Sequence, residues 1–140
     1  MLEENIQNGN AIKKLKEFLS AQGGDASVVD QPDALPQAAH KFELEAKESG
    51  YVENMVADEI GHAAMMLGAG RQTKESEIDL AVGIVLNKKV GDYVEKGESI
   101  LTIHANQTDV DEIKEKLYNN ISINSSEVQA PQLVHQLISQ

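Results

Sequence analysis

The sequence predicts an α+β protein in which short, mostly antiparallel strands pack with helices, and a pair of N-terminal helices comes first. Two observations support this class. Between Val90 and His104, Gly91 and Gly97 are each followed by an acidic residue, which is a tight-turn signal, and apolar residues return at short intervals. Such corners are typical of short strands in a small barrel or sandwich. Apolar residues also recur at helical spacing within residues 2–19 and 110–121.

Composition excludes several classes of function. A chain of 140 residues has about the length of one domain. It has no cysteine, which excludes thiol catalysis, disulfides and zinc–thiolate sites. Twelve basic and 23 acidic residues give a net charge of −11, so we expect no nucleic-acid and no membrane partner. Neither a membrane span nor a basic signal-peptide region is apparent, and we expect a cytoplasmic protein.

Residues 1–24 predict two short helices, and Gly23-Gly24 ends the second. Their apolar stripes contain Leu2, Ile6, Ile12, Leu15 and Leu19. Because so small a pair cannot bury these stripes by itself, we expect it to dock on the rest of the chain or on something that the chain lacks. Turn signals in residues 25–37 predict a linker, and residues 38–140 then form the C-terminal α+β domain.

Residues 38–86 predict three strands and a helix. Apolar and polar residues alternate around Leu44, and Tyr51–Val56 follows as a second strand, so the two resemble a hairpin. A helix is expected to begin near Asp58 and end at Gly68. Leu80–Leu86 is apolar on both faces, which predicts a buried strand.

The last forty residues predict one more helix and a closing element. Thr108 and Asp111 resemble a capping box, and Glu112 can pair with Lys116 on the exposed face of the helix that follows. The apolar stripe of this helix contains Val110, Ile113, Leu117 and Ile121. The tail, Val128–Ile138, predicts a closing strand or a short helix.

The Val90–His104 segment resembles the region around the prosthetic-group hairpin of biotinyl and lipoyl carrier domains. The resemblance implies a barrel-sandwich hybrid of the α/β-hammerhead type, with a lipoyl/biotinyl-like core. Carrier domains attach their group to a Lys ten residues after the Gly that matches Gly97, and that position is Gln107. An amide cannot be biotinylated or lipoylated there, so the fold resemblance stands without the carrier chemistry.

The Gly68-Ala69-Gly70 segment invites a phosphate-binding interpretation. A dinucleotide fingerprint needs a third Gly where Thr73 stands, and a strand before the first Gly where we expect a helix. We therefore interpret the segment as a helix end with a close backbone crossing. Arg71 could face a neighbouring domain, and Arg71, Gly68 and Gly70 are the candidate interdomain contact.

No catalytic, substrate-binding or metal-binding residue is predicted, and no cofactor is expected in this chain. The four histidines lack zinc-ligand spacing. Asp109 and Asp111 lack the Gly and the closing Glu of a calcium-binding loop. No serine lies in a nucleophile elbow, and no carboxylate pair is singled out for acid–base chemistry.

Longer segments carry a second resemblance, which covers nearly the whole chain in order. They are residues 8–11, 16–19, 21–29, 50–52, 58–61, 63–65, 67–71, 78–86, 88–92 and 96–98. Together they resemble the C-terminal region of the pyrimidine-nucleoside phosphorylase family, of which thymidine phosphorylase is a close relative. The segments Gln22–Asp25 and Asp79–Leu86 are more similar to the bacterial enzymes of broader specificity.

This resemblance implies a homodimeric, cytoplasmic parent enzyme of pyrimidine salvage, a glycosyltransferase. It would use phosphate to cleave uridine or thymidine reversibly into the base and a pentose 1-phosphate. The family's phosphate-binding and base-binding residues and its potassium site lie upstream of the matched region. We therefore expect a C-terminal piece that begins with the last helices of the α/β domain, partners the remaining catalytic domains and is inactive alone. A carrier domain and a free-standing adaptor are the alternatives.

Overall fold

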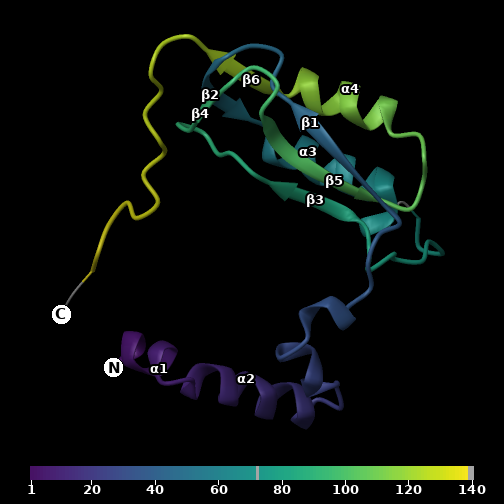
Figure 1. The fold of residues 1–140 in the computed structure, drawn as a ribbon, viewed down its shortest axis with the longest axis vertical. Coiled ribbons are helices and arrows are strands. Elements are labelled where there is room, and N and C mark those ends of the chain that lie inside the picture. Colours follow the sequence, from purple (N-terminus) through teal and green to yellow (C-terminus); the bar gives the residue numbers. More distant parts are fainter. Residues whose placement is uncertain (72, 139–140) are drawn as a thin grey trace. The chain divides into compact units, whose positions relative to one another are not determined.

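The structure is a computed structural model that describes residues 1–71 and 73–138. The chain divides into two compact units, residues 1–37 and residues 38–140. The N-terminal unit is helical and contains α1 (Leu2–Gln7), α2 (Asn10–Ala21) and the 3-10 helices η1 (Ala26–Val29) and η2 (Pro32–Ala34). The C-terminal unit contains β1 (His40–Glu45), β2 (Gly50–Met55), α3 (Ala57–Ala64), η3 (Met65–Ala69), β3 (Gly83–Leu86), β4 (Tyr93–Val94), β5 (Ser99–Ala105), α4 (Asp111–Asn119) and β6 (Ile121–Asn124). The predicted α+β class is confirmed (Figure 1).

The two predicted N-terminal helices are present, and the chain turns after the second one as expected. Gly23 adopts a φ of 78°, and the N–H of Gly24 donates to the carbonyl of Leu19 at 2.9 Å. The predicted linker, residues 25–37, holds η1 and η2 and belongs to the same unit as the helices. A salt bridge of 2.7 Å between Lys16 and Asp30 joins α2 to the end of η1.

Antiparallel strands of the C-terminal unit form two three-stranded sheets, with the strand orders β1-β5-β3 and β4-β2-β6. The predicted hairpin of the first two strands is wrong, because β1 pairs with β5 whereas β2 pairs with β4 and β6. Leu44 of β1 and Val52 of β2 are both fully buried, but in different apolar clusters. Since each strand finds its partner far along the sequence, the local turn at residues 49–50 could not reveal the pairing.

Gly91 and Gly97 bend the chain as predicted, with φ values of 96° and 85°. Each corner also holds another segment in place. The N–H of Gly97 donates to the carbonyl of Ala46, while the N–H of Ala46 donates to the carbonyl of Glu98, both at 2.8 Å. The N–H of Gly91 donates to the carbonyl of Val52 at 2.9 Å. The two corners therefore connect β4 and the start of β5 to β1 and β2.

The buried strand predicted for Leu80–Leu86 is wrong in both extent and burial. The strand begins at Gly83 and lies at an edge of its sheet, where only β5 pairs with it. Leu80 remains 79% exposed and Val85 51% exposed. β5 occupies the centre of the sheet instead, and Leu101 and Ile103 of that strand are completely buried.

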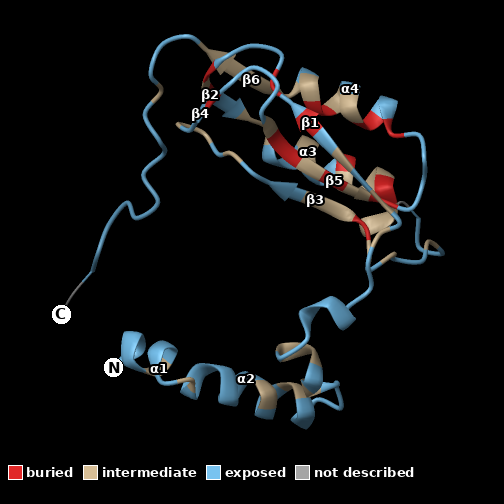
Figure 2. Ribbon diagram, in the orientation of Figure 1, coloured by how far each residue is buried: buried red, intermediate tan, exposed pale blue. Residues whose placement is uncertain are grey.

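The helix α3 runs into a π-helical turn, η3, and the chain reverses at Gly68, close to the predicted end. The helix α4 buries Ile113 and Leu117 as predicted, and Val110, directly before the helix, is also buried, whereas Ile121 already belongs to β6. Figure 2 shows the buried residues on β1, β5, α3 and α4.

The predicted capping box of α4 is wrong, because Asp109 accepts the hydrogen bond from the N–H of Asp111, at 3.0 Å. Lys116 forms its salt bridge with Glu59 of α3 instead of Glu112. The tail, predicted as a strand or helix, has neither form in the residues described up to 138.

Candidate functional site

The Gly68–Gly70 turn closes on its own neighbours. Gly68 adopts a φ of 106°, and its carbonyl accepts a hydrogen bond of 3.0 Å from the N–H of Asp79. A Cβ atom added at Gly70 would lie 3.3 Å from Cγ of Met65, so this backbone passes close to the preceding helical turn. Among the described residues between Gly70 and β3, no helix begins whose N-terminus could face a phosphate.

A network of side-chain hydrogen bonds extends from this turn. Asp79 accepts from the N–H of Ala81 at 2.9 Å and from the amide of Asn106 at 2.6 Å. Asn106 in turn accepts from the N–H of Ala39 at 2.8 Å. These bonds join the start of β1, the end of β5 and the segment that leads to β3. Sequence reasoning missed the network, because its members lie 27 and 67 residues apart.

Of the three predicted contact residues, the structure brings Gly68 and Gly70 into the packed turn and leaves Arg71 exposed. The guanidinium is therefore available on the surface of the C-terminal unit beside this turn. Arginine suits such a position in an interdomain contact, because its planar guanidinium donates several hydrogen bonds in a fixed geometry.

Gln107 occupies the position at which a carrier domain would bear its modified lysine. It lies exposed in the bend that follows β5, and α4 begins four residues later, at Asp111. The second strand of a carrier hairpin is thus replaced by a helix. The amide side chain and the following helix both disfavour the carrier alternative.

Titratable side chains are distributed over the surface. In residues 1–71 and 73–138, no polar or charged side chain is classed as buried, and no three His, Asp or Glu residues gather as a metal site. Glu59 accepts a hydrogen bond from Lys116 and lies 3.7 Å from Nδ1 of His62. The hydrogen bond and charge of Lys116 lower the pKa of Glu59. This group joins α3 to α4, and its carboxylate is stabilised as the anion.

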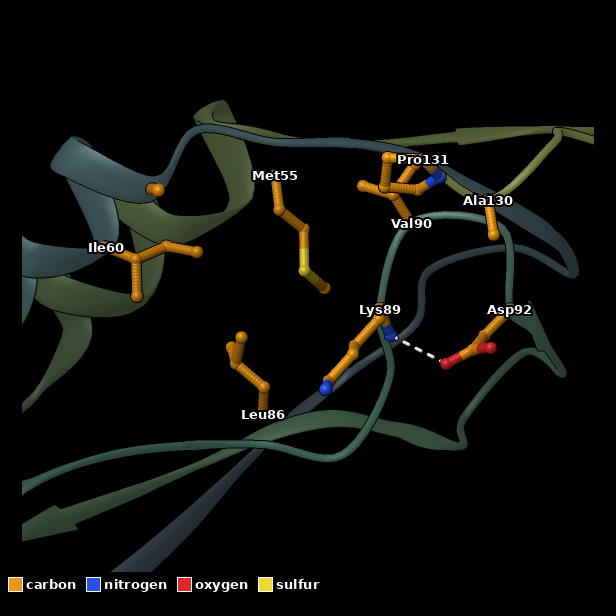
Figure 3. A pocket seen from close by; sticks show the side chains of 9 residues that line it. Met55, Ile60, Leu86, Lys89, Val90, Asp92, Ala130 and Pro131 are labelled. Atoms are coloured by element: carbon orange, nitrogen blue, oxygen red, sulfur yellow. Dashed lines mark hydrogen bonds between the residues drawn. The ribbon is translucent and has the colours of Figure 1, made fainter. Parts of the chain in front are cut away.

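An apolar cavity of about 440 Å³ opens in the C-terminal unit (Figure 3). Its wall contains the apolar residues Met55, Ala57, Ile60, Leu86, Val90 and Pro131. Lys89 and Asp92 stand in the loop at one side, where the N–H of Lys89 donates to the Asp92 carboxylate at 2.8 Å. Its volume lies in the range of ligand pockets, about 300–1,000 Å³. Sequence reasoning missed it, because its wall combines segments from β2, α3, β3 and the tail.

Comparison with known proteins shows the family of this chain. The description of the matching family model is "Pyrimidine nucleoside phosphorylase C-terminal domain", and the match covers residues 51–124. Over 139 residues the chain is 61% identical to the pyrimidine-nucleoside phosphorylase of Geobacillus stearothermophilus and 59% identical to that of Bacillus subtilis (strain 168). Each alignment covers 99% of this chain but 32% of the relative, so the chain spans about a third of these curated proteins.

The fold defines an α+β domain with an apolar core. The family match and the high identities specify it further. This chain belongs to the pyrimidine nucleoside phosphorylase C-terminal domain family. No helix in the described part of the chain has the length and apolar character to cross a membrane.

Proposed function

We propose that this chain supports the catalytic domains of a pyrimidine-nucleoside phosphorylase, as the C-terminal part of that enzyme. The observation that carries the proposal is the 61% identity along almost the entire chain, combined with coverage of only 32% of the relative. The parent enzyme phosphorolyses uridine or thymidine reversibly, giving the free base and ribose or deoxyribose 1-phosphate. It is a cytoplasmic homodimer whose phosphate, nucleoside and potassium sites lie in the other domains.

Activity of the isolated chain tests this proposal. We expect no release of uracil when the purified 140-residue chain is incubated with uridine and phosphate, because the reactive groups belong to the remaining domains. The full-length parent serves as the positive control, and absorbance of the released base provides the measurement. Release of uracil by the chain alone, above the enzyme-free blank, would overturn a purely supporting role.

We further infer that residues 1–24 are the terminal helices of the preceding α/β domain, with residues 25–37 as linker and 38–140 as the C-terminal domain. Exposure of the apolar stripes supports this assignment: Leu2 is 78%, Ile6 71% and Ile12 50% exposed. In the full-length parent these side chains pack on the α/β domain. Hydrogen exchange should therefore protect α2 more strongly in the parent than in the 140-residue chain, and equal protection would contradict the assignment.

Arg71, with the Gly68–Gly70 turn, forms a contact with the neighbouring domain in this proposal. The support is the exposure of Arg71 beside a turn that the Asp79 hydrogen bonds hold in place. Domain closure during turnover depends on such contacts. In the full-length parent, Arg71→Ala should change KM, kcat or stability, whereas Lys74→Ala in the same exposed loop should change none. Identical values for both variants and the parent would remove Arg71 from the contact.

For the arrangement of the two sheets we propose the barrel-sandwich hybrid of the α/β-hammerhead type. The antiparallel pairing and the glycine corners at Gly91 and Gly97 support it. A crystal structure of the parent, superposed on a lipoyl or biotinyl domain, tests the proposal. A strand order that cannot be superposed on that core would contradict it.

A further inference from the structure

The tail of this chain has an unusual composition for a segment that extends into solvent. From Val128 to Gln140 it contains no Asp, Glu, Lys or Arg, although the whole chain has a net charge of −11. Its large aliphatic residues are Leu133, Val134, Leu137 and Ile138, which are 91%, 66%, 86% and 84% exposed. Segments that remain solvated normally have few aliphatic residues and many charges. The tail therefore has the chemistry of a segment that covers an apolar surface.

The apolar cavity lies where the tail begins. Ala130 and Pro131 are already part of its wall (Figure 3). Ala130 packs directly on the loop after β3, because a Cβ atom added at Gly91 would lie 2.9 Å from both Cα and N of Ala130. Leu133 comes two residues after Pro131, which limits its Cα to about 7 Å from the Cα of Pro131. The aliphatic residues are thus tethered at the rim of the cavity.

The spacing of these aliphatic residues indicates the conformation in which they bind an apolar surface. Positions 133, 134, 137 and 138 share one face of an α-helix. Pro131 precedes them, and proline is favoured in the first turn of a helix. Because an isolated helix of under about 12 residues is marginal in water, such a helix needs an apolar surface to form.

We propose that residues 131–138 dock on the cavity of their own unit as a short amphipathic helix that begins at Pro131. Its apolar face covers Met55, Ile60 and Leu86, which the extended tail leaves accessible. The docked tail then acts as a strap that closes the cavity, with the Ala130–Gly91 contact as its fixed end. This inference goes beyond the supporting role proposed above and does not depend on it.

Disulfide trapping tests the docking directly, because the chain contains no cysteine of its own. In the 140-residue chain, Leu86→Cys with Leu137→Cys should form an intramolecular disulfide about tenfold faster than Glu112→Cys with Leu137→Cys, because docking raises the effective concentration of the first pair. The second pair is the matched control, since Glu112 lies exposed on the first turn of α4. Equal rates would overturn the proposal, and a product that is only dimeric would show that the tail binds a second copy instead.

Dye binding provides a second measurement that needs no thiol. Leu137→Asp should release the strap and raise the fluorescence of a dye that binds exposed apolar surface about twofold. Gln136→Asp adds the same charge one residue earlier, on the polar side of the helix, and should leave the fluorescence unchanged. Equal fluorescence of the two variants would overturn the proposal. Neither experiment measures phosphorolysis, so its result is independent of the proposed function.

Discussion

Gly91 illustrates at the residue scale how one position serves both backbone conformation and packing. Its φ of 96° is a left-handed conformation, in which a residue with a side chain is strained. Its N–H donates a hydrogen bond to the carbonyl of Val52. Gly97 has a similar φ of 85°, but an added Cβ atom there would meet nothing within 4 Å. The corners that look equivalent in the sequence therefore differ in their surroundings.

We predict that Gly91→Ala destabilises the chain more than Gly97→Ala. The backbone strain is shared and costs about 1–2 kcal/mol in each variant. Gly91→Ala also forces the new methyl group against Ala130, an overpacking penalty of about 1–3 kcal/mol more. Urea unfolding monitored by circular dichroism gives both values. Equal losses would mean that Ala130 moves away freely.

At the scale of the element, the comparison of α4 with the Leu80–Leu86 segment shows what a sequence pattern can indicate. The helical stripe of α4 faces the core, and Leu117 is 1% exposed. The Leu80–Leu86 segment is at least as hydrophobic in sequence, yet its Leu80 is 79% exposed. Periodicity identifies the buried face of an amphipathic helix, but a continuous apolar run does not reveal whether its strand is central or at an edge.

This contrast predicts the cost of truncating each leucine. Leu117→Ala should lower the free energy of unfolding by about 2–5 kcal/mol, because it leaves a cavity in the core. Leu80→Ala should change it by no more than about 0.5 kcal/mol, as expected for a surface position. Denaturant titrations of both variants beside the parent chain provide the test. A large loss for Leu80→Ala would show that this residue is buried in solution.

At the scale of the whole molecule, the core belongs to one unit. Every residue of the described chain that forms the two buried apolar clusters lies between Leu44 and Leu117. The family match, residues 51–124, falls in the same unit. The N-terminal unit contributes helices without a buried residue among those described.

We therefore predict that a chain starting at Ala38 folds by itself. Its urea midpoint, followed by the circular dichroism of the sheets, should match that of the 140-residue chain, because all of its core side chains are retained. An isolated peptide of residues 1–37 should be largely unfolded, since short helices without a packed face are marginal in water. Loss of cooperative unfolding in the shortened chain would contradict this independence.

Local sequence patterns were sufficient to predict many structural features of this protein. The N-terminal helices, the buried stripe of α4, the glycine corners and the replacement of a carrier lysine by Gln107 all follow from residues close together in the chain. The family resemblance, confirmed by the comparisons, likewise rests on contiguous segments. These features depend on local conformation and short-range periodicity, which the order of residues specifies directly.

Only the tertiary structure decided which strands pair, which apolar segment is buried and which polar side chains meet. β1 pairs with β5 instead of its sequence neighbour β2, and Asn106 bonds to Asp79 and Ala39. The wall of the apolar cavity likewise unites residues between 55 and 131. Such contacts depend on how distant segments pack together, because many pairings satisfy the same local pattern and only one buries Leu44, Leu101 and Ile103 together.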